Sequence, residues 1–269
     1  MSMRKRLPTA LILLALVFVA IQFSSDWVFF LLIQIVVLAS LLEFYNLASR
    51  RKHAPRKLIG FVLALLIAAS FYFEALSFEL ALFVSLLILG ISFVLVINTL
   101  EKLMGFPSAI ALTFFGSIYL SFTLNHFYIL RVAKGPFWIY FLFAVIFIGD
   151  TGAYAVGKLV GRHKMTPLAS PNKTWEGSIG GVVAACLGGL IAQQILLSDA
   201  VWWKAVIFAF VIHVVAQVSD PLESLFKRAA GVKDSSNILP GHGGVLDRID
   251  SLILAAPFFY YLLKFIGMD

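Results

Sequence analysis

The chain has 269 residues, of which 61% are hydrophobic and 13% charged, and its mean hydropathy is +0.97. Soluble domains carry about a quarter charged residues, so this composition excludes an ordinary soluble protein and indicates an integral membrane protein. The formal net charge of +7 would suit a nucleic-acid-binding protein. Basic residues in a multi-pass chain usually set its orientation instead, and we expect no nucleic acid partner.

Hydrophobic runs long enough to cross a hydrocarbon core of about 30 Å recur along the chain. Because backbone polar groups find no water in the bilayer, we predict an all-α, polytopic membrane protein with about nine helical spans. The first run resembles a signal peptide, but "VAIQFSSD" offers no small-x-small cleavage site, which favours a retained helix. The expected spans are residues 7–23, 27–48, 58–73, 80–97, 107–130, 137–155, 178–197, 201–219 and 250–266.

The basic residues predict the orientation of these spans. With the N-terminus in the cytoplasm, 17 of the 21 Lys and Arg residues fall on the inner side. Two inner loops, 156–177 and 220–249, are long and rich in charge, Gly and Pro, so we expect the active site at the cytoplasmic face of the cell membrane. Residues 1–100 are then N-terminal transmembrane helices for substrate access or assembly, and 101–269 form the catalytic region.

The single cysteine, Cys186, lies within a predicted span, which excludes an internal disulfide and a cysteine metal cluster. It belongs to a stretch of small residues, "GSIGGVVAACLGG", that is typical of closely packed membrane helices. Such packing can join helices within one chain or between protomers of a homo-oligomer, and we favour packing within the chain.

Polar residues inside the spans gather toward the inner side. Asp150 ends the apolar part of the sixth span, and a carboxylate at that depth needs a partner. On the eighth span, His213, Gln217 and Asp220 follow the i, i+4, i+7 spacing of one helical face, which Ser224 continues. The sequence "DPLE" also allows Asp220 to cap a new helix. Glu43, on the second span, suits either a buried polar contact or a substrate role.

The stretch after Asp220 combines cations, glycines and carboxylates. Glycines at 241, 243 and 244 let the backbone turn successive N–H groups toward an anion, as in a phosphate nest. Asp247 and Asp250 share a face at the start of the ninth helix, where they complement the helix dipole or, with Asp220, form an oxygen site for Mg²⁺. The basic residues of the stretch are Lys227, Arg228, Lys233 and Arg248, and His242 either contacts phosphate or packs in the loop.

The spacing of these residues resembles a family signature. Ser224, Lys227-Arg228, Lys233-Asp234, Pro240-Gly241-His242-Gly243-Gly244 and Asp247-Arg248-x-Asp250 are similar to the pattern of phosphatidate cytidylyltransferases, also called CDP-diacylglycerol synthases. A second stretch, from Asp150 through Ser170-Pro171-Asn172-Lys173-Thr174-x-Glu176-Gly177, resembles the same family. The match covers the C-terminal half, and Ser219-Asp220-Pro221 departs from the Gly-Asp-Leu of the pattern.

The resemblance implies a reaction in which CTP and phosphatidic acid give CDP-diacylglycerol and pyrophosphate. For this reaction we expect Asp220 and Asp247, with Asp250 or Asp150 as further ligands, to hold Mg²⁺, and the basic residues and glycines after Asp220 to hold the triphosphate. Ser224 belongs to the same nucleotide site, while Lys173 and Arg162 would receive the lipid phosphate or the nucleotide.

Two other functions fit parts of the sequence. A CTP-dependent kinase of a lipid alcohol would move the γ-phosphoryl group to a hydroxyl and would need a positioned base. The full PGHGGxxDRxD stretch argues against it. A secondary transporter would place its site near the bilayer midplane between repeated halves, whereas here the charge lies at one surface and no internal repeat is found.

Overall fold

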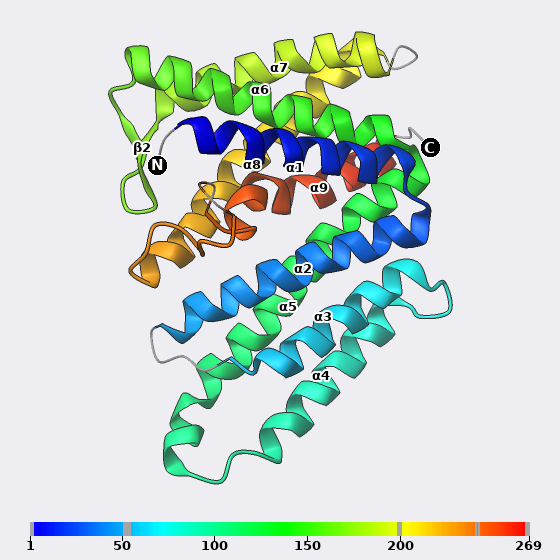
Figure 1. Ribbon diagram of the computed structural model, residues 1–269, viewed down its shortest axis with the longest axis vertical. Helices are drawn as coiled ribbons and strands as arrows, with labels where there is room; N and C mark the ends of the chain where they lie inside the picture. Colours follow the sequence, from blue (N-terminus) through cyan, green and yellow to red (C-terminus); the bar gives the residue numbers. More distant parts are fainter. Residues whose placement is uncertain (1–2, 51–54, 198–200, 240, 242, 267–269) are drawn as a thin grey trace. The chain divides into compact units, whose positions relative to one another are not determined.

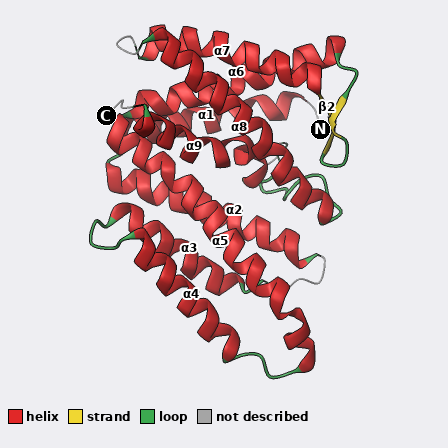
Figure 2. Cartoon of the chain, turned by 180° about the vertical axis from the view of Figure 1, so that it is seen from behind, coloured by secondary structure: helices red, strands yellow, loops and turns green. Residues whose placement is uncertain are grey.

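The computed structural model describes residues 3–50, 55–197, 201–239, 241 and 243–266. These residues form α-helices and one short β-hairpin (Figures 1 and 2). The elements are α1 (Met3–Phe23), α2 (Asp26–Ser49), α3 (Lys57–Tyr72), α4 (Phe78–Val94), α5 (Leu100–Lys134), α6 (Pro136–Val160), β1 (Lys164–Thr166), β2 (Ser170–Thr174), α7 (Trp175–Leu196), α8 (Trp202–Ala229) and α9 (Leu246–Phe265).

A helix lies over each predicted span. Among the described residues, five helices are long and apolar enough to cross a membrane: α2, α5, α6, α7 and α8. Shorter apolar helices cover Leu11–Phe23, α3 and α4. The fold is therefore helical and of the multi-pass membrane type, as predicted. The total of nine crossings remains a prediction.

The course of α8 differs from the prediction. The predicted span ended at residue 219 and was followed by a loop, with a new helix starting at Asp220 as one alternative, but α8 continues through Pro221 to Ala229. Proline inside a helix removes one backbone hydrogen bond and costs about 3 kcal/mol. The buried face of α8 continues past Pro221 through Glu223, Ser224 and Lys227, and this packing offsets the cost. The segment between α8 and α9 is correspondingly shorter than the expected loop 220–249.

The segment between α6 and α7 contains structure that was not predicted. β1 and β2 pair antiparallel within the expected loop 156–177, with Lys164 opposite Thr174 and Thr166 opposite Ser170 (Figure 2). Strands of three and five residues are too short to give a recognisable alternation of polar and apolar residues.

The chain divides into two compact units. The first unit comprises Met1–Tyr128 and Ala229–Arg248. Its helices are joined by buried hydroxyls: Tyr45 Oη on α2 donates to the Thr113 carbonyl of α5 at 2.6 Å, and Ser121 Oγ donates to the Ala64 carbonyl of α3 at 2.6 Å. Leu63 and Leu89 form part of its apolar core.

The second unit comprises Ile129–Arg228 and Ile249–Asp269. In it α6 and α7 lie side by side (Figure 1), so close that a Cβ on Gly152 would overlap with Ala184. Packing of the small-residue stretch within the chain is thus confirmed. Phe141 of α6, Phe208 of α8 and Phe259 of α9 form an aromatic cluster that joins these three helices.

Candidate functional site

A cavity of about 640 Å³ lies in the second unit, between α6, the hairpin, α7 and α8. Charged and polar side chains contribute to its lining. Two carboxylates, three ammonium groups, a hydroxyl and an amide are among the groups that line it: Asp150, Asp220, Lys158, Lys164, Lys173, Ser178 and Gln217. With three lysines and two aspartates, the cavity suits an anionic ligand, and its carboxylates suit a divalent cation.

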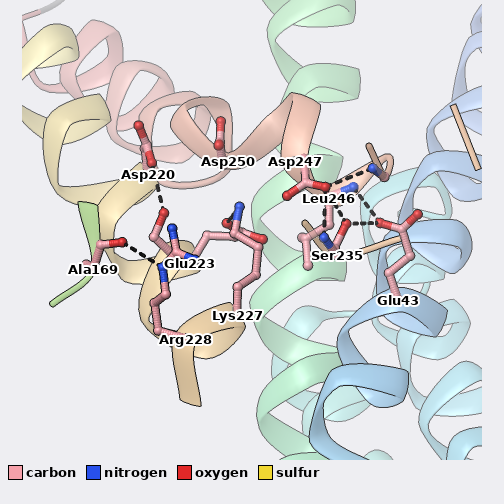
Figure 3. A network of polar contacts seen from close by, with 12 residues as sticks. Glu43, Ala169, Asp220, Glu223, Lys227, Arg228, Ser235, Leu246, Asp247 and Asp250 are labelled. Atoms are coloured by element: carbon pink, nitrogen blue, oxygen red, sulfur yellow. Dashed lines mark hydrogen bonds and ion pairs between the residues drawn. The ribbon is translucent and has the colours of Figure 1, made fainter. Parts of the chain in front are cut away.

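An ion pair joins two of the predicted site residues. Lys173 Nζ on β2 lies 2.7 Å from Asp220 Oδ2 on α8, and both side chains are about 30% exposed. Ser224 Oγ donates to Asp220 Oδ1 at 3.4 Å (Figure 3). Asp150 reaches the same cavity from α6 and is exposed there. The structure therefore brings Asp150, Lys173, Asp220 and Ser224 together.

Gln217 fixes one wall of the cavity. It accepts a hydrogen bond from Ser178 Oγ, and its Nε2 donates to the Ser178 carbonyl at 2.9 Å, which ties α8 to α7. Deeper on the same face, His213 is fully buried against Gly149 and Gly181. The predicted stripe on α8 is thus confirmed as one face, with Gln217 and Asp220 at the cavity and His213 in the packed interior.

The hairpin is held by a carboxylate at the start of α7. Glu176 accepts hydrogen bonds from the backbone N–H groups of Arg162 and His163, and its Oε1 lies 2.5 Å from His163 Nδ1. Thr174 caps α7 by accepting from the Gly177 N–H at 3.2 Å. This anchoring presents Lys164 and Lys173 to the cavity.

The predicted cations at the end of α8 have partners within the second unit (Figure 3). Lys227 Nζ lies 2.5 Å from Glu223 Oε2 in a buried i, i+4 ion pair. Arg228 Nε donates to the Ala169 carbonyl of the hairpin turn at 3.3 Å. The positive charge of Lys227 is thus already paired with a buried carboxylate on the same helix.

Asp250 lies in the first turns of α9, in the portion of this helix that belongs to the second unit. Its Oδ1 accepts from the Ser251 N–H at 2.7 Å, and its carbonyl accepts from Ser219 Oγ on α8. The second contact holds the backbone of α9 at Asp250 next to Ser219, which directly precedes Asp220 on α8.

The signature loop, residues 235–247, belongs to the first unit. Gly241 and Gly243 have φ angles of +78° and +80°, which glycine adopts without strain. The Gly244 N–H donates to Asp247 Oδ2 at 2.8 Å, so this backbone N–H already has a hydrogen-bond acceptor within the loop. Lys233 and Arg248 are exposed in the same unit. Pro240 and His242 lie outside the described residues.

A model of the cytidylyltransferase family matches residues 4–266 of the chain. The chain belongs to this family. The resemblance found in the sequence motifs is thereby confirmed. A phosphatidate cytidylyltransferase of Bacillus subtilis is 35% identical over 271 residues, which cover 97% of this chain and 98% of that protein.

Other relatives of this cytidylyltransferase family member match over shorter stretches. A phosphatidate cytidylyltransferase of Staphylococcus saprophyticus is 42% identical over 131 residues, and one of Brucella suis is 47% identical over 122 residues. In these two matches the chain spans about half the length of the relative, 50% and 45%.

Sequence reasoning missed several groups that line the cavity. Lys158 and Lys164 were assigned to membrane orientation alone, and Ser178 was assigned no role, although all three line the cavity. All three residues lie within or directly after the second stretch that resembles the family, and this position could have identified them. In the part of the chain that the structure describes, no three His, Cys, Asp or Glu side chains form a ready metal cluster. The predicted metal ligands therefore remain a prediction.

Proposed function

We propose that this protein is a phosphatidate cytidylyltransferase. It transfers the cytidylyl group of CTP to phosphatidic acid and releases pyrophosphate, and the product, CDP-diacylglycerol, enters phospholipid biosynthesis. The observation that carries the proposal is the cavity in which Lys173, Asp220 and Asp150 meet, within a chain of this family.

The nucleophile needs little activation. A phosphate monoester has a second pKa of about 6, so phosphatidic acid is largely a dianion at neutral pH. One of its oxygens bonds to the α-phosphorus of CTP while the bond from that phosphorus to the pyrophosphate oxygen breaks. The main obstacle is repulsion between two anions, and the ammonium groups of Lys158, Lys164 and Lys173 reduce it by holding both substrates in the cavity.

The carboxylates of the cavity fit Mg²⁺, which prefers oxygen ligands. Asp150 and Asp220 reach the cavity from different helices, and Asp220 already holds a cationic ammonium group at 2.7 Å. The predicted ligands of Mg²⁺ remain Asp220 and Asp247, with Asp250 or Asp150 as further contributors, and the cavity favours Asp150 as the further ligand. When bound, Mg²⁺ supplies positive charge that offsets the charge of the triphosphate and of the leaving pyrophosphate.

The remaining predicted residues are assigned to the substrates in this proposal. Ser224 orients Asp220 through its hydrogen bond. The triphosphate is assigned to the basic residues that follow Asp220 and to the glycine loop, and Arg162 to the lipid phosphate. The members of this nucleotide group are Lys227, Arg228, Lys233, Arg248, Gly241, His242, Gly243 and Gly244. The acyl chains remain in the bilayer, and the cavity faces the cytoplasm.

Two labels on CTP test the proposal. Purified full-length protein is incubated with phosphatidic acid, Mg²⁺ and CTP carrying label on either the α- or the γ-phosphate. We expect only the α-label to enter lipid, and Asp220→Asn to abolish the transfer. Lipid that carries only the γ-label would identify a kinase instead, and no nucleotide-dependent labelling would overturn both enzyme functions.

A further inference from the structure

Glu43 on α2 is a buried carboxylate with four hydrogen-bond donors, all from the signature loop (Figure 3). Its side chain is 1% exposed. Oε1 accepts from Ser236 Oγ at 2.7 Å and from the Val245 N–H at 3.0 Å. Oε2 accepts from Ser235 Oγ at 2.7 Å and from the Leu246 N–H at 2.9 Å. Burial of a carboxylate is costly unless such donors compensate for lost water.

Two of these donors belong to the N-terminus of α9, which begins at Leu246. The first N–H groups of a helix have no partner within the helix, and a negative charge is favourable there. Glu43 supplies that charge from about 200 residues away in the sequence, although all the residues concerned lie in the first unit. The loop and the helix start are thus attached to the second membrane helix.

Ser235 connects Glu43 to a predicted metal ligand. Its Oγ lies 2.7 Å from Glu43 Oε2 and 2.9 Å from Asp247 Oδ2, and its N–H donates to Asp247 Oδ2 at 2.9 Å. The position of the Asp247 carboxylate therefore depends on the position of Ser235, which Glu43 holds.

Gly244 is required for this arrangement. A Cβ at Gly244 would overlap with Ser235 Oγ and with the Glu43 carboxylate. Neither group lies at the far end of a free side chain, because both are held by the hydrogen bonds described above. The backbone of the loop can pass this close to Glu43 only where the residue has no side chain.

We propose that Glu43 is the positioning residue of the signature loop: it holds Ser235, Ser236 and residues 244–246 in one conformation, and through Ser235 it sets the place of the Asp247 carboxylate. Glu43 does not contact substrate in this proposal. It acts on nucleotide binding, so the inference deepens the proposed cytidylyl transfer and rests on it.

Hydrogen exchange of the loop amides tests the attachment itself, independently of activity. In purified full-length protein we expect Glu43→Gln to speed exchange at Val245 and Leu246 by about tenfold or more, because one acceptor oxygen is replaced by a donor NH₂ group. Ser40→Ala is the matched control, since Ser40 is buried on the same helix and its hydroxyl donates to Val36 of its own helix. We expect exchange at Val245 and Leu246 to be unchanged in this control. Wild-type exchange in Glu43→Gln would overturn the proposal.

Steady-state kinetics test the consequence for the substrates. We expect Glu43→Gln to raise KM for CTP by about tenfold while KM for phosphatidic acid stays within about twofold. A role in folding alone would instead lower kcat by reducing the amount of active protein and leave both KM values unchanged, and that result would overturn the proposal. Should Glu43→Gln not fold, Ser236→Ala removes one donor, keeps the carboxylate, and is expected to shift KM for CTP in the same direction by a smaller factor.

The two proposals fail separately. If wild-type protein forms no CDP-diacylglycerol from CTP, the proposed function is wrong, while the exchange experiment still decides whether Glu43 holds the loop. If wild-type protein is active and Glu43→Gln matches it in both exchange and KM for CTP, only the positioning role is wrong.

Discussion

Lys173 Nζ and Asp220 Oδ2 lie 2.7 Å apart, and this ion pair joins the hairpin between α6 and α7 to the middle of α8. Lys173, which is proposed to bind a phosphate, is thus paired with Asp220, which is proposed to bind Mg²⁺. Binding of a magnesium nucleotide offers each side chain a new partner of the opposite charge. The pair keeps both groups ordered in the cavity before the substrates arrive.

Removal of this pair is expected to affect activity far more than stability. We predict that Lys173→Gln and Asp220→Asn each reduce CTP-dependent lipid labelling at least about a hundredfold, because preorganised charges at the reacting phosphates are lost. An ion pair with side chains about 30% exposed contributes little to folding, so the free energy of unfolding should change by about 1 kcal/mol or less. Activity and thermal unfolding in detergent measure the two effects.

Lys204→Gln serves as the control for these charge changes. Lys204 lies near the start of α8 and contacts the Trp203 ring, at the other end of the helix from the cavity. Its substitution should leave labelling within about twofold of wild type. Comparable labelling by Lys173→Gln and Lys204→Gln would remove Lys173 from the proposed site.

The contact of α6 with α7 predicts a large effect of one methyl group. Gly152→Ala places a Cβ where it overlaps with Ala184 Cβ, and two packed helix backbones must move apart. We expect a loss of about 1–3 kcal/mol in the free energy of unfolding. Gly90→Ala on α4 adds the same methyl group with nothing within 4 Å, and its greater helix propensity should leave stability unchanged or up to about 1 kcal/mol higher. Equal stability of the two variants would contradict the close packing.

The fold was predictable from sequence wherever a long local pattern determines the structure. Apolar runs of sufficient length identified the helices, and the spacing of Gln217 and Asp220 placed them on one face of α8. The local sequence was misleading at Pro221. The residues D-P-L-E suit the start of a helix, but α8 continues through them because its buried face extends past Pro221. Tertiary packing outweighed local preference there.

The partner of Glu43 was not predictable in the same way. A glutamate within an apolar helix indicates some polar contact, but nothing near Glu43 in the sequence identifies Ser235, Ser236 or the start of α9. The same holds for Lys164, whose place at the cavity depends on the hairpin. Contacts between residues far apart in sequence require the fold.

The carboxylates of the cavity predict a requirement for a divalent cation. Chelation should abolish labelling of lipid from CTP, and added Mg²⁺ should restore it. Asp150→Asn should raise the Mg²⁺ concentration needed for half-maximal activity by about tenfold or more, because one oxygen ligand loses its charge. The neighbouring Thr151→Val is the control, since the Thr151 hydroxyl donates to Phe147 of its own helix. An unchanged Mg²⁺ requirement in Asp150→Asn would exclude Asp150 from the metal site.

The distribution of basic residues predicts that the two ends of α6 lie on opposite sides of the membrane. With 25 residues, α6 is about 37 Å long, enough to cross a hydrocarbon core of about 30 Å. Ala133, before α6, and Leu168, in the hairpin turn after it, are both exposed. In a Cys186→Ser background we expect a membrane-impermeant maleimide to label Ala133→Cys in right-side-out vesicles and Leu168→Cys in inverted vesicles. The reverse pattern would place the cavity outside the cytoplasm, where it could not meet CTP, and would overturn the proposed orientation.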